Sequence, residues 1–148
     1  MTGLQAALGR AQLGKIEEII SQKRRVAATY NQALAHVPGL QLPAEADWAR
    51  NVYWMYAVVV WPEFPLRRDH LTACLAEQGI DTRTFFCPMN QQPCLQARAG
   101  YRPVACPVAD RLWEQGLYLP SSYNLSPPTI YWIAERIAQA GAGARKVA

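Results

Sequence analysis

The sequence predicts an α/β fold in which helices and a small three-stranded sheet form a two-layer sandwich. The chain has 148 residues, 51% apolar and 18% charged, which is the size and composition of one globular domain with a single core. Segments with helical and strand-like patterns alternate along it, in the order helix, strand, helix, strand, helix, strand, helix. The pattern leaves open whether the strands run parallel or antiparallel.

A long helix is predicted over residues 1–37. Thr2 and Gln5 form a capping-box pair at its start, and apolar residues follow at helical spacing until the helix ends near His36. We expect a bend near Gly14. The helix is longer than a compact domain of this size needs to cover a sheet face. Its first half is therefore expected to pack on something outside this chain, between domains or in an oligomer.

Residues 38–140 are predicted to form the small α/β domain. Its first strand is expected within residues 52–61, a near-continuous apolar run that indicates a strand covered on both faces or central in its sheet. A helix over about residues 67–78 should follow and end at Gly79, because glycine readily adopts the left-handed backbone that closes a helix.

The remaining helices and strands are predicted from weaker sequence patterns. Residues 93–103 are expected to be irregular. A helix should begin at Pro107, which suits a first-turn position, and a short strand should cover residues 117–119. Ser126 is expected to cap the last helix, and the small, basic residues 141–148 to form a flexible tail.

The most informative stretch is residues 79–93, where a short β-branched and aromatic run precedes a polar segment held between prolines. This predicts a strand and then an irregular loop. The strand would bury Ile80. Arg83, Asn90 and Gln91 would lie at or beyond its end, where polar groups can converge on a ligand. The alternative, which the residues alone favour, is that these side chains are ordinary solvated surface.

Charge and hydropathy argue against several classes of function. The formal charge is +4, but the arginines are spread along the chain and the only basic run is residues 23–25, which is not a pattern for binding nucleic acid. No apolar run approaches the roughly 20 residues of a membrane span, and no signal peptide precedes the first helix. We therefore expect neither nucleic acid nor a membrane as a partner, and a cytoplasmic location.

Few residues could carry chemistry by themselves. No nucleophile stands in a motif with a base, and no glycine-rich loop opens a helix to hold phosphate. The cysteines match no paired metal-binding spacing, which indicates free thiols in a reducing compartment. The sequence therefore predicts no metal site and no self-sufficient active site. The cysteines are Cys74, Cys87, Cys94 and Cys106.

Several stretches, in order along the chain, resemble the DegT-like sugar aminotransferases, a family that uses pyridoxal phosphate (PLP) to convert keto-sugar nucleotides to amino sugars. Residues 79–93 are most similar to its perosamine synthetase branch, with a glycine-isoleucine, threonine-arginine, aromatic pair, proline and glutamine-proline pattern. The other similar stretches are residues 1–13, residues 23–25 with Tyr30, and residues 106–109 followed by 116–120.

The resemblance implies that this chain corresponds to the C-terminal third of such an enzyme, with the fold of the small domain of fold type I PLP-dependent transferases. It also implies that Arg83, Asn90 and Gln91 bind the nucleotide sugar. The chain departs from the family at Asn90, where many relatives carry a histidine. An amide can hydrogen-bond a sugar hydroxyl but cannot titrate near neutral pH, so an acid-base role there is not expected.

A second departure concerns the cofactor, which in the family is bound by a lysine of a larger upstream domain. The lysines here are Lys15, Lys23 and Lys146, and none stands in a context that resembles the cofactor lysine. Without such a lysine PLP cannot be held covalently. We therefore expect no cofactor and no catalytic residue in this chain alone.

The resemblance leaves two hypotheses on function. The chain is a truncated aminotransferase domain from polysaccharide or antibiotic sugar biosynthesis that is inactive alone, or it is a stand-alone, non-catalytic module that oligomerises or binds a sugar nucleotide. In both, a nucleotide sugar is expected to bind weakly, and an apolar stripe on the first helix is expected to mediate a homodimer or higher oligomer. The apolar stripe consists of Leu4, Leu8, Ile16 and Ile20.

Overall fold

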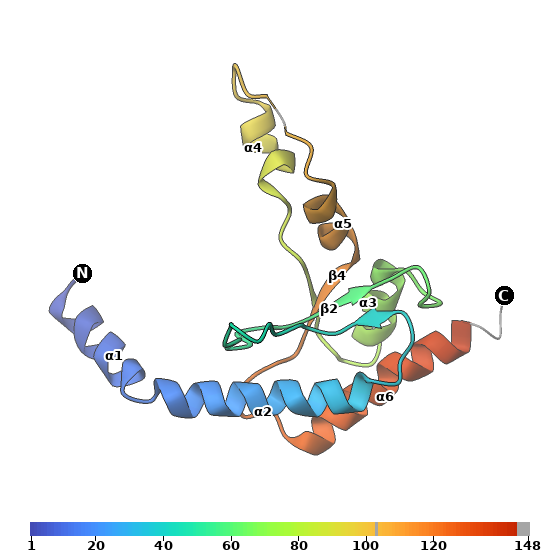
Figure 1. Ribbon diagram of the computed structural model, residues 1–148, viewed down its shortest axis with the longest axis horizontal. Coiled ribbons are helices and arrows are strands. Elements are labelled where there is room, and N and C mark those ends of the chain that lie inside the picture. Colours follow the sequence, from blue (N-terminus) through green and yellow to red (C-terminus); the bar gives the residue numbers. More distant parts are fainter. Residues whose placement is uncertain (103, 145–148) are drawn as a thin grey trace.

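An antiparallel sheet of four strands lies at the centre of the computed structural model, which describes residues 1–102 and 104–144. The strands stand in the order β1-β2-β4-β3, with β2 and β4 in the middle (Figure 1). Their bounds are Leu40–Gln41 for β1, Tyr56–Val60 for β2, Arg83–Thr84 for β3 and Gly116–Leu119 for β4. The predicted number of three strands is wrong. The missed strand, β1, has only two residues. It is a strand because it pairs with β2, and not because of a local sequence pattern.

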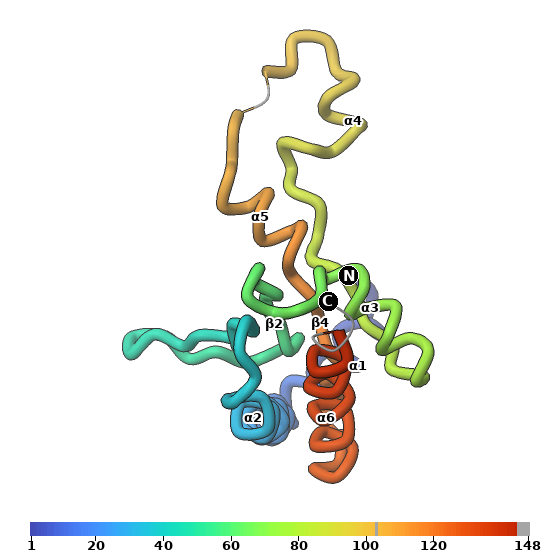
Figure 2. Tube along the Cα trace, turned by 90° about the vertical axis from the view of Figure 1, so that its right-hand side faces the viewer, coloured from blue at the N-terminus to red at the C-terminus, as the bar shows by residue number. Residues whose placement is uncertain are grey.

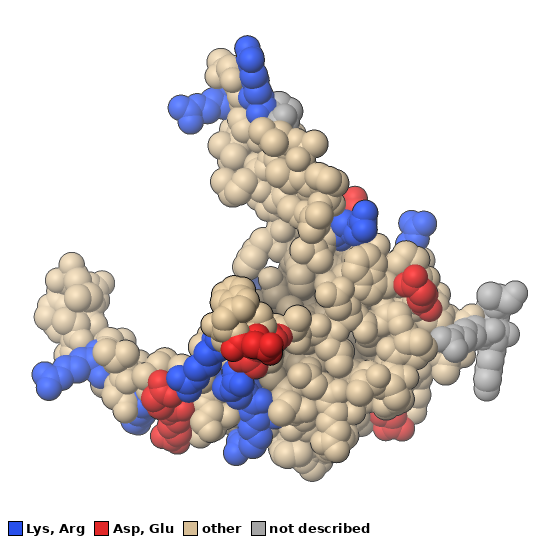
Figure 3. Space-filling view, viewed as in Figure 1, with Lys and Arg blue, Asp and Glu red and all other residues tan. Residues whose placement is uncertain are grey.

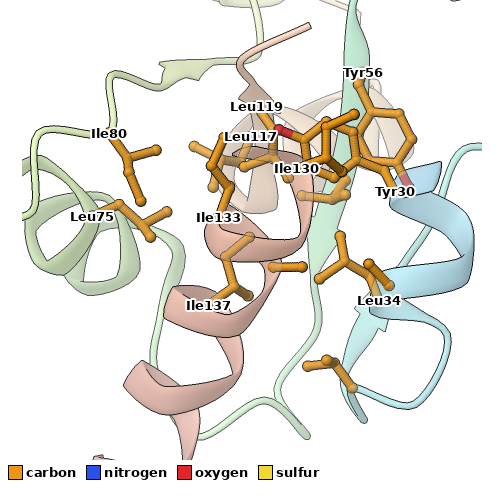
Figure 4. Packing of buried hydrophobic residues seen from close by; sticks show 14 of the residues in the cluster. Tyr30, Leu34, Tyr56, Leu75, Ile80, Leu117, Leu119, Ile130, Ile133 and Ile137 are labelled. Carbon is orange, nitrogen blue, oxygen red and sulfur yellow. The ribbon is translucent and has the colours of Figure 1, made fainter. Parts of the chain in front are cut away.

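Helices α2 (Ile16–Leu34), α3 (Arg68–Ala76) and α6 (Pro127–Ala144) pack on one face of this sheet. In Figures 1 and 2, α2 and α6 lie side by side below β2 and β4, and α3 packs against α6. Buried side chains from the sheet and these helices form one core, shown in Figure 4. Its largest fully buried members are Tyr30, Leu34, Tyr56, Val58, Leu71, Leu75, Leu117, Ile130 and Ile137.

Two stacked tyrosines tie α2 to the sheet in this core. The ring centroids of Tyr30 and Tyr56 are 4.5 Å apart. The Tyr30 hydroxyl donates to the carbonyl of Pro120 (2.9 Å), and the Tyr56 hydroxyl donates to Oδ1 of Asn31 (2.7 Å). Burial raises the pKa of both phenols far above the ordinary value, so both remain neutral donors.

The first predicted strand is shorter than the pattern indicated, because only Tyr56–Val60 of residues 52–61 is a strand. Its central place between β1 and β4 is as predicted. Tyr53 has a φ of +46°, in the left-handed region, so the extended backbone cannot begin before it. The side chain of Asn51 stabilises this turn, since its Oδ1 accepts the Tyr53 N–H at 2.8 Å.

The predicted N-terminal helix is two helices, α1 (Gly3–Leu13) and α2, with a break at Gly14 and Lys15. The capping box is confirmed: the Thr2 N–H donates to Oε1 of Gln5 (2.8 Å), and the Gln5 N–H donates to Oγ1 of Thr2 (3.3 Å). No residue of α1 is buried, whereas the second half of α2 lies in the core. The bend expected near Gly14 is therefore a break between two helices.

Residues 86–102 and 104–115 project from the body as an arm (Figures 1 and 2). The arm contains the short helices η1 (Met89–Gln91) and α4 (Pro93–Gln96), and α5 (Pro107–Gln115), none of which has a buried residue. The prediction of an irregular stretch over residues 93–103 missed α4, a single turn that Pro93 opens at its first position. The two-layer sandwich is also wrong as a description of the whole chain, because the arm and α1 lie outside the two layers.

The last helix runs further than predicted, to Ala144. Gly141, assigned above to a flexible tail, is buried against the ring of Phe64. Lys146 lies outside the described residues. In the chain as described, no helix combines the length and the apolarity needed to cross a membrane.

Candidate functional site

The chain enters the candidate site through the end of α3. Gly79 has a φ of +74° and no neighbour near the place of a Cβ atom, so glycine is required here by the backbone and not by space. The Gly79 N–H donates to the carbonyl of Ala76 (2.9 Å) and the Ile80 N–H to that of Leu75 (3.0 Å). Ile80 is 3% exposed, so its side chain anchors the turn in the core. The chain enters β3 from this turn.

Arg83 opens β3, at the edge of the sheet. It pairs directly with Tyr118 of β4, so the two side chains lie on the same face, as partners in an antiparallel pair do. The Arg83 side chain is exposed, and among the residues that the structure describes it forms no hydrogen bond or ion pair. Its guanidinium donors are thus available to a ligand.

Aromatic side chains surround Tyr118 beside Arg83. We call Trp54, Phe85, Phe86 and Tyr118 the aromatic cluster. The ring of Phe85 stacks on Tyr118 with centroids 4.7 Å apart, and the rings of Phe86 and Trp54 are tilted against it at 6.1 and 6.4 Å. Phe86 is 71% exposed and Trp54 62%, so the cluster offers solvent an apolar surface on which planar groups can stack.

Asn90 and Gln91 converge on a residue that the sequence did not single out, Asp110 of α5. Gln91 Nε2 donates to Oδ1 of Asp110 at 2.6 Å and Asn90 Nδ2 donates to the same oxygen at 3.4 Å. These bonds tie η1 to the first turn of α5. The structure therefore brings Asn90 and Gln91 together, but among the described residues neither forms a hydrogen bond with Arg83. One feature of the sequence could have pointed to Asp110: it lies in the first turn of a predicted helix, where a carboxylate is favoured.

Lys23 binds the backbone at Trp54, one member of the aromatic cluster. Its Nζ donates to the carbonyls of Trp54 (2.8 Å) and Ser121 (2.6 Å), which joins α2 to the residues flanking β2 and β4. Burial lowers the pKa of this ammonium group. The sequence had shown Lys23 only as part of a basic run, because its partners lie far along the chain.

A cluster of polar contacts holds the loop before Trp54 against α2. Arg24 pairs with Glu45 through two hydrogen bonds of 2.6 and 3.0 Å and also donates to the carbonyl of Asn51. The Arg24 guanidinium, and then the Asn51 N–H, lower the pKa of the Glu45 carboxyl to about 2, so the pair stays charged. The guanidinium also lies 5.7 Å from the centre of the Tyr53 ring.

The functional interpretation of the face around Arg83 depends on similarity to known proteins. The sequence model of the DegT/DnrJ/EryC1/StrS aminotransferase family matches residues 1–138. The chain belongs to this family. It is 34% identical over 121 residues to GDP-perosamine synthase of Vibrio cholerae, which covers 82% of the chain and 32% of that relative. It is 28% identical to the spore coat polysaccharide biosynthesis protein SpsC of Bacillus subtilis, over 97% of the chain and 38% of SpsC.

Solved structures agree with this assignment. DesV of S. venezuelae superposes with a TM-score of 0.80 at 28% identity, over 93% of the chain and 36% of DesV. The aminotransferase TlmJ of Streptoalloteichus hindustanus gives a TM-score of 0.77 at 25% identity, over 93% of the chain and 36% of TlmJ. The resemblance to the family and to perosamine synthetases is confirmed. The chain spans about a third of the length of the curated relatives it matches.

The family's cofactor, PLP, does not fit the lysines of the described chain. Lys15 is exposed at the break between α1 and α2, and no described side chain donates a hydrogen bond toward it that could position a cofactor ring. The Lys23 amine donates to two backbone carbonyls and could form a covalent bond only by giving up both. No step of a reaction can be assigned to these residues.

Proposed function

We propose that this chain is the small C-terminal part of a PLP-dependent nucleotide-sugar aminotransferase, and that its contribution is to bind the nucleotide sugar with the face around Arg83. The exposed, unpaired guanidinium beside the aromatic cluster, in a chain of this family, carries the proposal. The relatives include GDP-perosamine synthases and a polysaccharide biosynthesis protein, which supports a role in making polysaccharide sugars. Alone, the chain does not transaminate.

The side chains of this face match the parts of a nucleotide sugar. The planar guanidinium of Arg83 suits two oxygens of a diphosphate, and the aromatic cluster offers a stacking surface for a base or a sugar ring. Asn90 and Gln91 use their amide N–H groups on Asp110. Their amide oxygens accept no hydrogen bond from any described residue, so they remain acceptors for sugar hydroxyls.

The face around Arg83 is open to solvent on one side, which limits its affinity for a nucleotide sugar. Figure 3 shows a broad concavity between the arm, the body and α1. Ligand sites usually bury most of the ligand surface, and this face covers a ligand from one side only. In this proposal, the part of the relatives that this chain does not span would cover the other side of the ligand.

Titration with GDP-mannose, followed by NMR amide shifts, tests the proposed face. We expect a dissociation constant on the order of 1 mM, with shifts in residues 83–91 and at Trp54 and Tyr118. Arg83→Ala should abolish measurable binding, because it removes the guanidinium proposed to pair with the diphosphate. Arg25→Ala is the matched control, since it removes an exposed arginine on α2, and it should leave the shifts unchanged. Shifts clustered elsewhere would show that the face is misplaced.

Borohydride reduction in the presence of PLP tests the absence of a cofactor lysine. We expect slow, scattered labelling and no single modified lysine, because Lys23 is bound to two carbonyls and Lys15 is exposed. Peptide mapping by mass spectrometry gives the readout. Stoichiometric labelling of either lysine would contradict the expectation.

The second hypothesis is a stand-alone module that oligomerises. The observation that favours it is α1, a helix without a buried residue in which Leu4 and Leu8 are 83% and 63% exposed. An isolated helix of this length is marginal in water, so α1 needs a covering surface. A second copy of the chain is the candidate that can be tested directly, as described in the Discussion.

A further inference from the structure

One side chain, Asp110, joins the two limbs of the arm. The chain leaves the body along residues 86–102 and returns through α5 (Figure 1). Among the described residues, the only hydrogen bonds between these limbs are those from Asn90 and Gln91 to Asp110 Oδ1. No residue of η1, α4 or α5 is buried, so no apolar core sets the distance between them. The Asp110 carboxylate therefore controls how the limbs lie against each other.

The outgoing limb holds its own shape through two further glutamines. Gln92 Nε2 donates to the carbonyl of Cys87 at 3.0 Å, and Gln96 Nε2 donates to the carbonyl of Asn90 at 3.3 Å. These bonds lie within the limb and do not reach α5. The segment that carries Asn90 and Gln91 is thus one unit, and Asp110 places this unit relative to α5.

Asp110 also decides which end of each amide points away from α5. A carboxylate accepts hydrogen bonds and cannot donate them, whereas a side-chain amide has a donating NH₂ group and an accepting oxygen. Asn90 and Gln91 must therefore turn their NH₂ groups toward Asp110. Their oxygens are left free, because no described residue donates to them. Both amides thus offer acceptors, and not donors, to a ligand.

We propose that Asp110 is a positioning residue for the nucleotide sugar, which holds the oxygens of Asn90 and Gln91 toward the ligand. The inference rests on the function proposed above. Sugar hydroxyls and amino groups carry the hydrogen-bond donors that these oxygens need, whereas a keto group carries none. This part of the site therefore selects sugar positions with a hydroxyl or an amino group. Asp110 itself does not touch the ligand.

The sign of the charge effect separates this role from simple electrostatics. The diphosphate is negatively charged, so removal of a nearby carboxylate should by itself strengthen binding slightly. Asp110→Ala removes the charge and the acceptor. Asp110→Asn removes the charge alone, because an oxygen can stay in place of Oδ1 while the nitrogen replaces Oδ2, to which no described residue donates. The two variants have the same net charge and differ in the acceptor.

Titration of the 148-residue chain with GDP-mannose, followed by NMR amide shifts, measures the effect. We expect Asp110→Ala to weaken binding about five- to tenfold and Asp110→Asn to bind within about threefold of the unmodified chain. Glu114→Ala is the charge control, because it removes an exposed carboxylate one turn further along α5, and it should not weaken binding. Equal weakening in both Asp110 variants, or none in Asp110→Ala, would overturn the proposal.

A measurement without ligand tests the positioning itself. The side-chain amide protons of Gln91 should be protected from exchange with water in the unmodified chain and in Asp110→Asn, but not in Asp110→Ala. Backbone shifts of residues 16–84 should agree in all three, which shows that the body stays folded. An unprotected Gln91 amide in the unmodified chain would refute the positioning role.

The two proposals can fail separately. If GDP-mannose does not bind the unmodified chain, the function proposed for the Arg83 face is wrong, and so is a role for Asp110 in binding. If Arg83→Ala abolishes binding and Asp110→Ala leaves it unchanged, the Arg83 face stands and only the role of Asp110 is refuted.

Discussion

Gly116→Ala is expected to lower the free energy of unfolding by about 2 to 3 kcal/mol. The backbone of Gly116 has ordinary angles, so the cause is space. A Cβ atom would overlap the ring of Phe85 and lie 2.5 Å from the carbonyl oxygen of Leu112. Neither can move easily, because Phe85 stacks on Tyr118 and the carbonyl belongs to α5. Urea unfolding followed by circular dichroism measures the change.

The same substitution should disturb the aromatic cluster, because Phe85 must leave its place on Tyr118. Gly9→Ala is the matched control: Gly9 lies within α1 with no atom near the place of a Cβ, so alanine should be neutral or stabilising by up to about 1 kcal/mol. A loss of stability for Gly116→Ala no larger than about 0.5 kcal/mol would show that Phe85 does not pack against this glycine.

Leu4→Glu combined with Leu8→Glu is expected to convert an oligomer into a monomer. The structure supports the predicted apolar stripe in part: Leu4, Leu8 and Ile16 are 83%, 63% and 39% exposed, whereas Ile20 is half-buried. Burial of a leucine contributes about 1.5 to 3 kcal/mol. Loss of two per protomer should weaken self-association by a factor on the order of 100 or more.

Sedimentation at micromolar concentration measures this effect. The unmodified chain should sediment as a dimer or higher oligomer and the double variant as a monomer. Ser21→Glu with Ala28→Glu is the control, because it adds the same two charges at exposed positions of α2 outside the stripe, and it should not change the association state. A monomeric unmodified chain would reject self-association through α1 and leave another surface to cover this helix.

Local rules in the sequence were enough for several helix ends, although not for the single turn α4 or the break between α1 and α2. The capping box of Thr2 and Gln5, the helix end at Gly79, and the start of α5 at Pro107 each depend on residues within a few positions, and the structure confirms them. The motif around Arg83 likewise identified the family, since it is a contiguous pattern.

The sequence by itself thus determined most of the helices, the central strand and the family, whereas only the tertiary structure decided the sheet order and the partners of the polar residues. The two-residue strands β1 and β3 exist only because β2 and β4 lie beside them. Asn90 and Gln91 meet Asp110 across about twenty positions, and Lys23 meets Ser121 across 98. Such contacts form only when the folded backbone brings distant segments together, so no local pattern encodes them.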